Sequence, residues 1–151
     1  MHKHLILKQL MYLQFLLMHG KLAHVNSEET DRSLVAAWRE LLGRHATTWC
    51  ALERELGEQH GLGVSEFEVL ERLVEDAKEV HRVQELARAT YLSQSALSRV
   101  IGRLERDGLV TRSMCDVDRR GIYVSLTEAG RARHAAARAT QRAVLAATLG
   151  G

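Results

Sequence analysis

The sequence predicts a mainly α-helical domain that carries one small β-hairpin. Three observations support this fold class. None of the 151 residues is proline, so nothing of that kind interrupts long helices. Apolar residues recur at heptad spacing between positions 35 and 56. In residues 109–114 and 121–126 the pattern changes to a period of two, which is typical of β-strands.

The composition favours a single intracellular domain without an active site. A chain of 151 residues is long enough for one hydrophobic core. Its two cysteines, Cys50 and Cys115, form no C-x-x-C pair, which favours a reducing compartment and a cytoplasmic location. We expect Cys50 to be a small buried apolar residue and Cys115 to be exposed. No nucleophile elbow, HExxH, P-loop or dinucleotide motif occurs, so we expect no catalytic residue, cofactor or metal site.

The charges of the chain are unevenly distributed. Residues 27–80 contain 13 acidic residues against 6 Lys and Arg, whereas residues 81–151 contain 12 arginines against 6 acidic residues. An arginine-rich half indicates contact with a polyanion such as nucleic acid. Chance segregation of charges on a solvated surface is the alternative.

Residues 1–25 differ from the rest in being rich in Leu, Met, Lys and His. We interpret them as an appended amphipathic helix or a non-native leader. The apolar stretch Leu10–Met18 is too short to span a membrane, and no small-x-small cleavage site of a secretory signal follows it. A metal site formed by His2, His4 and His19 is an alternative for this segment. The predicted domain then comprises residues 26–151.

A long helix is predicted over about residues 27–61. Its apolar residues fall into two heptad positions, of which one holds Val35, Leu42, Trp49 and Leu56 and the other holds Trp38, His45 and Leu52. Such a stripe packs against a second copy of the chain or against its own domain. Together with a C-terminal helix over about 127–149, this helix forms the predicted dimerisation region.

The segment between these two helices, about residues 64–126, is the predicted DNA-binding core. It begins with a helix capped by Ser65, in which Phe67, Leu70, Leu73 and Val74 repeat at helical spacing. A polar link over 76–81 leads to a short helix at Val83–Ala89. Ser93 caps a longer helix that reaches Asp107 and ends at Gly108, and Thr127 caps the final helix after the hairpin.

The short helix, the turn Thr90–Leu92 and the longer helix form a helix-turn-helix. In the longer helix, the residues predicted to face the core are Ala96, Leu97, Val100, Ile101 and Leu104. On the opposite face, small polar residues permit close approach to base edges, and Arg99 could bind a guanine through two hydrogen bonds. The predicted DNA-binding residues here are Ser93, Gln94, Ser95, Ser98, Arg99 and Arg103. An ordinary solvated helix face is the alternative.

The hairpin loop, residues 115–120, supplies a second predicted DNA contact. It carries Arg119 and Arg120, and arginine side chains are attracted by the negative potential of the minor groove. Asp116 and Asp118 in the same loop could orient these arginines by charge-assisted hydrogen bonds.

The sequence resembles the MarR family over about residues 33–149. The segments that carry this resemblance are Leu86-Ala87, Ser95–Ile101, Arg103–Val110, Asp118–Arg120 and Leu126–Gly130. The resemblance implies a winged-helix homodimer that is joined through its terminal helices and represses transcription at a palindromic double-stranded operator. It also implies that Arg120 enters the minor groove, that Asp118 orients the wing arginines and that Ser95–Arg99 contact the major groove. The family usually adds a further C-terminal helix, for which the segment 1–25 could substitute.

Many members of the family are released from DNA by small aromatic or phenolic acids bound beside the dimer helix. The corresponding candidates are Trp38, Arg39, Arg44, His45, Trp49 and Phe67. A purely structural role of these residues in the seam and the core is the alternative. Two other functions stay open: a thiol-based redox regulator using Cys50 or Cys115, and a helical adaptor that binds protein instead of DNA. No contact with a membrane is expected.

Overall fold

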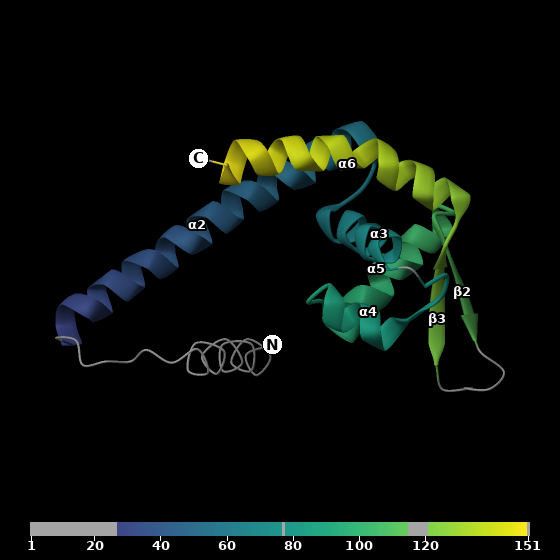
Figure 1. Cartoon of the computed structure of the whole chain (residues 1–151), viewed down its shortest axis with the longest axis horizontal. Coiled ribbons are helices and arrows are strands. Elements are labelled where there is room, and N and C mark those ends of the chain that lie inside the picture. The colour runs from purple at the N-terminus through teal and green to yellow at the C-terminus, as the bar shows by residue number, and fades with distance from the viewer. Residues whose placement is uncertain (1–26, 77, 115–120, 151) are drawn as a thin grey trace. The chain divides into compact units, whose positions relative to one another are not determined.

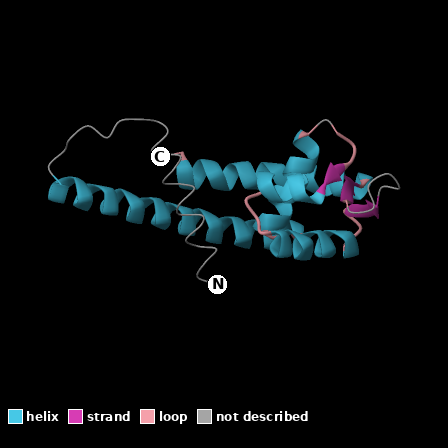
Figure 2. Cartoon of the chain, turned by 90° about the horizontal axis from the view of Figure 1, so that it is seen from below, coloured by secondary structure: helices cyan, strands magenta, loops and turns pink. Residues whose placement is uncertain are grey.

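The computed structural model describes residues 27–76, 78–114 and 121–150. In chain order they form helices α2 (Ser27–His60) and α3 (Val64–Glu75), strand β1 (His81–Arg82), helices α4 (Val83–Ala89) and α5 (Gln94–Arg106), strands β2 (Val110–Met114) and β3 (Ile122–Leu126), and helix α6 (Glu128–Leu149) (Figure 1). The predicted mainly α-helical fold with a small β wing is confirmed (Figure 2). The chain divides into two compact units, Met1–Leu41 and Leu42–Gly151.

The sheet has three antiparallel strands in the order β1-β3-β2, one more than the predicted hairpin. Strands β2 and β3 pair from Val110 opposite Leu126 to Met114 opposite Ile122. The sequence predicts only a polar link over 76–81, but His81 pairs with Val124 on the other edge of β3. Because β1 has two residues, it is too short to show a period of two, and its pairing with β3 defines it.

The hydrophobic core of the unit Leu42–Gly151 is formed by α3, α4, α5 and the sheet, together with the C-terminal part of α2 and with α6. The apolar positions predicted for α3 and α5 are buried, except that Val74 and Ala96 are only half-buried. The largest fully buried side chains are Phe67, Leu56, Leu62, Leu70, Leu97, Ile101, Leu104 and Leu109. This packing fixes which face of α5 remains exposed.

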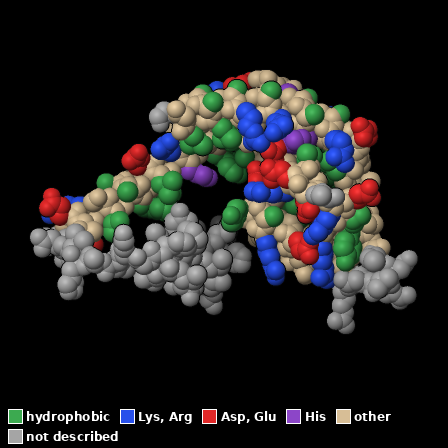
Figure 3. Space-filling view, in the orientation of Figure 1, with side chains coloured by type: hydrophobic (Ala, Val, Ile, Leu, Met, Phe, Trp, Pro, Cys, Tyr) green, Lys and Arg blue, Asp and Glu red, His purple; other side chains and the backbone are tan. Residues whose placement is uncertain are grey.

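The heptad residues of α2 have two different environments. Leu52 and Leu56 are buried in the core, at 7% and 0% exposure, whereas Trp38 and Leu42 are each 46% exposed. Leu34 and Leu41, which lie outside the heptad positions, are also exposed. We call all exposed large apolar residues of α2 the α2 stripe; it consists of Leu34, Val35, Trp38, Leu41, Leu42 and Trp49. Apolar side chains gather along α2 in Figure 3.

Helix α6 runs antiparallel to the C-terminal part of α2 within the second unit. Arg133 Nη1 donates a hydrogen bond to the His60 carbonyl oxygen at 2.8 Å, and Arg44 Nη2 donates to the Leu149 carbonyl oxygen at 3.3 Å. His60 Nε2 also lies 2.8 Å from the hydroxyl of Thr140. These contacts connect the two helices that the sequence assigns to the dimerisation region.

Two local predictions are wrong. Ser65 does not cap α3, because the N-cap is Gly63, whose N–H donates to the Glu66 carboxylate at 2.9 Å. Cys50 is exposed instead of buried. Thr48 and Leu52 of α2 are buried against the core. Cys50 lies two positions from each of them, so its side chain is rotated by about 200° around the helix and points to the other side. The predicted caps at Ser93 and Thr127 are confirmed, since their hydroxyls accept the Ala96 and Gly130 N–H groups.

Helix α6 begins in very close contact with the start of β2. The Thr127 N–H donates to the Leu109 carbonyl at 3.1 Å, and the Thr127 hydroxyl donates to the Gly108 carbonyl at 2.7 Å. A Cβ atom on Gly130 would lie 2.0 Å from the Leu109 carbonyl oxygen. Only glycine fits at position 130. This explains why the segment Leu126–Gly130 has glycine three residues after Thr127.

We therefore expect Gly130→Ala to lower the free energy of unfolding by about 1–3 kcal/mol or more, because the new methyl group overlaps backbone that cannot move freely. Gly57→Ala is the matched control, since nothing lies within 4 Å of its Cβ position in α2. This control should be neutral or stabilise the protein by about 0.5–1 kcal/mol. Urea unfolding followed by circular dichroism measures both, and equal effects would show that the close contact at Gly130 is unimportant.

Candidate nucleic-acid interface

Helices α4 and α5 are joined by the short turn that the sequence predicts. The Thr90 hydroxyl donates to the Leu86 carbonyl at 2.8 Å and so holds the end of α4. Tyr91 then adopts φ of 56°, in the left-handed region that non-glycine residues rarely occupy. Ser93 begins α5 and accepts the Ala96 N–H at 3.2 Å. The pair of helices is a helix-turn-helix.

Helix α5 has one apolar and one polar face, as predicted. Leu97, Val100, Ile101 and Leu104 are at most 3% exposed and pack on the core. The exposed residues on the other side are Gln94, Ser95, Ser98, Arg99, Arg103 and Arg106. Residues 94–102 contain no acidic side chain, so nothing in this segment repels a phosphate. Five of the predicted DNA-binding residues, Ser93, Gln94, Ser95, Ser98 and Arg99, thus lie together at the start of α5.

Arg103 differs from the other candidates because its guanidinium is bound to Glu66. Arg103 Nε donates to one carboxylate oxygen of Glu66, which is 8% exposed, and the other oxygen accepts the Gly63 N–H. Arg103 therefore connects α5 with the start of α3. Spacing along the chain could not reveal this partner, which is 37 residues away.

A shallow groove between α4 and α5 adds residues that the sequence analysis missed. It has a volume of about 400 Å³ and is lined by Gln84, Ala87, Arg88, Leu92, Ser93 and Gln94. Gln84 and Arg88 are exposed one helical turn apart on α4. The spacing of these two polar residues on one face of α4 is the sequence signal that could have predicted them as part of the interface. Basic side chains project from the lower edge of this unit in Figure 3.

The wing consists of β2, β3 and the loop 115–120. At its base, Arg112 Nε donates to Glu105 at the end of α5 at 2.7 Å, which connects the hairpin to α5. The hydrogen bond from Arg112 holds the pKa of Glu105 below its ordinary value. The predicted DNA contacts Asp118, Arg119 and Arg120, and also Cys115, lie outside the described residues.

The candidate effector residues lie in several environments. The rings of His45 and Trp49 are 5.8 Å apart on α2. Arg44 is bonded to the carbonyl of Leu149. Phe67 is 1% exposed and stacks on His134 with ring centroids 5.3 Å apart. Trp38 and Arg39 belong to the other compact unit. His45 and Trp49 are therefore the pair that the structure brings together.

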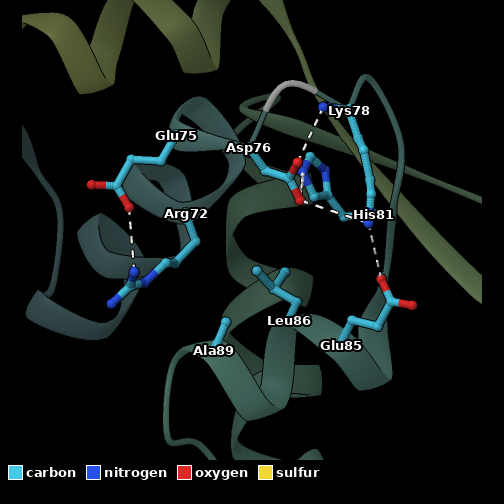
Figure 4. A pocket seen from close by; sticks show the side chains of 8 residues that line it. All are labelled: Arg72, Glu75, Asp76, Lys78, His81, Glu85, Leu86 and Ala89. Carbon is cyan, nitrogen blue, oxygen red and sulfur yellow. Dashed lines mark hydrogen bonds and ion pairs between the residues drawn. The ribbon is translucent and has the colours of Figure 1, made fainter.

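A cavity of about 420 Å³ lies between the end of α3, β1 and α4 (Figure 4). His81 lines it and is 6% exposed, with Nε2 at 3.4 Å from an Asp76 oxygen. Lys78 Nζ lies 3.9 Å from Asp76 and 3.6 Å from Glu85. The charges of Lys78, Asp76 and Glu85 in the cavity wall are therefore paired with one another.

The described residues contain no group of three His, Cys, Asp or Glu side chains arranged to bind a metal ion. No helix in that part of the chain combines the length and the hydropathy of a membrane span.

A helix-turn-helix followed by an antiparallel hairpin defines a winged-helix DNA-binding protein. The profile of the MarR family matches residues 60–121. AbsC, a MarR-family transcriptional regulator from Streptomyces coelicolor, is 30% identical, with 84% of this chain and 82% of AbsC covered and a TM-score of 0.71. The chain therefore belongs to the MarR family of transcriptional regulators, which are DNA-binding proteins and not enzymes.

Two further structures share the fold. Sco3205 from Streptomyces coelicolor, solved in complex with DNA, is 24% identical over 85% of this chain and 78% of its own, with a TM-score of 0.72. CouR from Rhodococcus jostii, bound to p-coumaroyl-CoA, is 28% identical over 74% of this chain and 77% of its own, with a TM-score of 0.63. No curated protein sequence matches the chain significantly.

The contact between Arg103 and Glu66 leads to a prediction about stability. Arg103→Ala should lower the free energy of unfolding by about 1–3 kcal/mol, because it leaves a buried carboxylate without its charged partner. Arg106→Ala, an exposed site on the same helix, should change it by no more than about 0.5 kcal/mol. Urea denaturation measures both variants. Equal stabilities would show that the bond between Arg103 and Glu66 contributes little to folding.

Proposed function

We propose that the protein is a cytoplasmic repressor that binds a palindromic double-stranded operator as a homodimer. The observation that carries this proposal is the polar, acid-free face at the start of α5, presented on a helix whose other face is buried. In a winged-helix protein this helix enters the major groove. Sco3205, which shares the fold, was solved in complex with DNA, and this supports a DNA-binding role.

Each side chain at the start of α5 suits a particular contact. Ser93, Ser95 and the backbone amides at the helix N-terminus are donors for phosphate oxygens. Gln94 and Ser98 have donors and acceptors for base edges, and Arg99 has the bidentate geometry that suits guanine. Gln84 and Arg88 of α4 line the adjacent groove and would contact the phosphate backbone. In the wing loop, Arg119 and Arg120 would enter the minor groove, with Asp118 as their anchor.

The α2 stripe supports a dimer. Six large apolar side chains on one helix are each between 39% and 62% exposed in the single chain. Contiguous apolar surface of this kind marks an interaction site, and heptad spacing is suited to a second helix of the same sequence. A dimer is also required for two recognition helices to contact two half-sites of a palindrome.

Leu42→Lys should therefore convert the dimer into a monomer and weaken operator binding indirectly, because a charge replaces an apolar side chain at the centre of the α2 stripe. Thr47→Lys is the matched control, since Thr47 is exposed and lies about 180° around the helix from Trp38. Light scattering at micromolar concentration gives the oligomeric state. A stable monomer of the unaltered protein would refute the proposal that it acts as a dimer.

A small aromatic acid is the proposed effector that releases the repressor. His45 and Trp49 support it, because their neighbouring rings, 5.8 Å apart, suit contact with an aromatic group, and Arg44, also on α2, is a candidate for the carboxylate. CouR, which shares the fold, binds a coumaroyl thioester. The other candidates, Trp38, Arg39 and Phe67, complete the proposed set.

Recognition by α5 and recognition by the wing should have different signatures. Arg99→Ala should reduce affinity by about 1–3 kcal/mol per half-site and relax the preference at one base pair, because a bidentate contact to a base is lost. Arg120→Ala should weaken binding to cognate and scrambled DNA alike, and reduce the salt dependence by roughly one ion per subunit. Fluorescence anisotropy with both DNAs at several salt concentrations measures these effects.

The opposite result would contradict the assignment. If Arg99→Ala keeps its sequence preference while Arg120→Ala loses it, the wing and not α5 provides base recognition. If neither variant changes binding to any DNA, the proposed interface is wrong.

A further inference from the structure

Helix α3 buries two carboxylates that face different neighbouring helices. Glu66 is 8% exposed and binds Arg103 of α5, whereas Glu71 is 7% exposed and binds α6. They lie five positions apart, so they point about 140° apart around the helix. Through these two groups α3 is bonded both to the recognition helix and to a helix of the proposed dimerisation region.

Glu71 has both of its oxygens occupied by α6. One oxygen binds Nε2 of His134, which is 5% exposed, and the other binds Nη2 of Arg142. The ring of His134 is held in turn by stacking on Phe67 of α3. Burial alone would raise the pKa of Glu71, but the bonds from His134 and Arg142 outweigh it and hold the pKa below its ordinary value of 4.5.

A buried ion pair contributes more to geometry than to net stability. Its removal in favour of apolar side chains of similar volume is often neutral, whereas separating the two charges inside the protein is costly. If α3 shifted along α6, the Glu71 carboxylate would lose both partners while it stayed buried. The contact of Glu71 with His134 and Arg142 therefore disfavours other relative positions of α3 and α6.

We propose that Glu71 is a positioning residue that makes operator recognition depend on the spacing between half-sites. This inference rests on the proposed function, a homodimer on a palindrome. In such a dimer, the separation of the two recognition helices depends on the angle between each DNA-binding core and its dimerisation helices. Glu71 holds that angle at the contact of α3 with α6, and the bond between Glu66 and Arg103 transmits it to α5.

The variants remove the contact from opposite sides. Arg142→Gln removes a cation whose side chain is 47% exposed, and Glu71→Met replaces the buried carboxylate by an apolar side chain of similar size. Arg142→Lys keeps the charge and is the conservative variant. Glu68→Gln is the matched control, because this carboxylate lies on the same helix but pairs with Arg72 of α3 itself at 3.1 Å.

The experiment measures affinity for the operator and for versions with one or two base pairs inserted between the half-sites. The unaltered protein and Glu68→Gln should lose about tenfold or more in affinity on an insertion, since half-site separation has to match the dimer. Arg142→Gln and Glu71→Met should bind the unaltered operator nearly as well but lose only about threefold or less on an insertion. Arg142→Lys should recover the discrimination.

Several outcomes overturn the inference. One is unchanged discrimination in Arg142→Gln. Another is an equal loss of affinity at every spacing together with a lower melting temperature, which indicates a purely structural role. If the unaltered protein is a folded dimer that binds no DNA, the proposed function itself fails. If it binds without any dependence on spacing, only the inference about Glu71 fails.

Acid unfolding gives an independent check on the ion pair. Because the folded-state pKa of Glu71 is lowered, the stabilisation is complete above pH 4.5 and is lost as the pH falls through the lowered value. Stability of Glu71→Met should therefore decline less in this range than that of the unaltered protein. Identical acid dependence would show that Glu71 is not held as a paired carboxylate and would contradict the inference.

Discussion

The packing around helix α3 is the constraint on which the second unit depends. This helix buries Phe67, Leu70 and Leu73, and it also buries Glu66 and Glu71. Apolar contacts alone permit neighbouring helices to slide, because the hydrophobic effect has no direction. Buried carboxylates do not permit it, since each must keep its cationic partner. The positions of α5 and α6 thus follow from the charges of α3 as much as from its apolar face.

This constraint divides the arginines of the second half into two groups. Arg103, Arg112 and Arg142 are bonded to Glu66, Glu105 and Glu71, and so connect elements of the fold. Others, such as Arg99 at the exposed start of α5, are presented on the polar face of the recognition helix. Part of the arginine content of residues 81–151 therefore serves to hold the fold together. The acidic residues of the first half have a corresponding role, because some of them are partners inside the protein.

The sequence predicted the elements whose signals are local. Helix α5 has a clear helical period, and its caps depend on residues within three positions, so its bounds and its two faces could be inferred. Strand β1 could not, because two residues show no period and the strand exists through pairing with Val124. Arg103 stays a predicted DNA contact, but its bond to Glu66 could not be foreseen, because that partner is 37 residues away in sequence. Glu71 gave no signal for the same reason, since His134 is 63 residues away.

The heptad pattern of α2 includes residues that pack in the core of their own unit and residues that stay exposed in the single chain. Heptad spacing places Leu42, Trp49 and Leu56 on one side of the helix, but it does not state what covers that side. In the described part of the chain, Leu56 is covered by the core of its own unit, and Leu42 and Trp49 are left 46% and 39% exposed. Leaving large apolar side chains in water is unfavourable at about 25 cal/mol per Å². A second copy of the same helix would remove this cost at Leu42 and Trp49 without altering the packing of Leu56. A continuous helix with one covered and one uncovered stretch is therefore what a subunit needs if its DNA-binding core is to be held at a dimer interface.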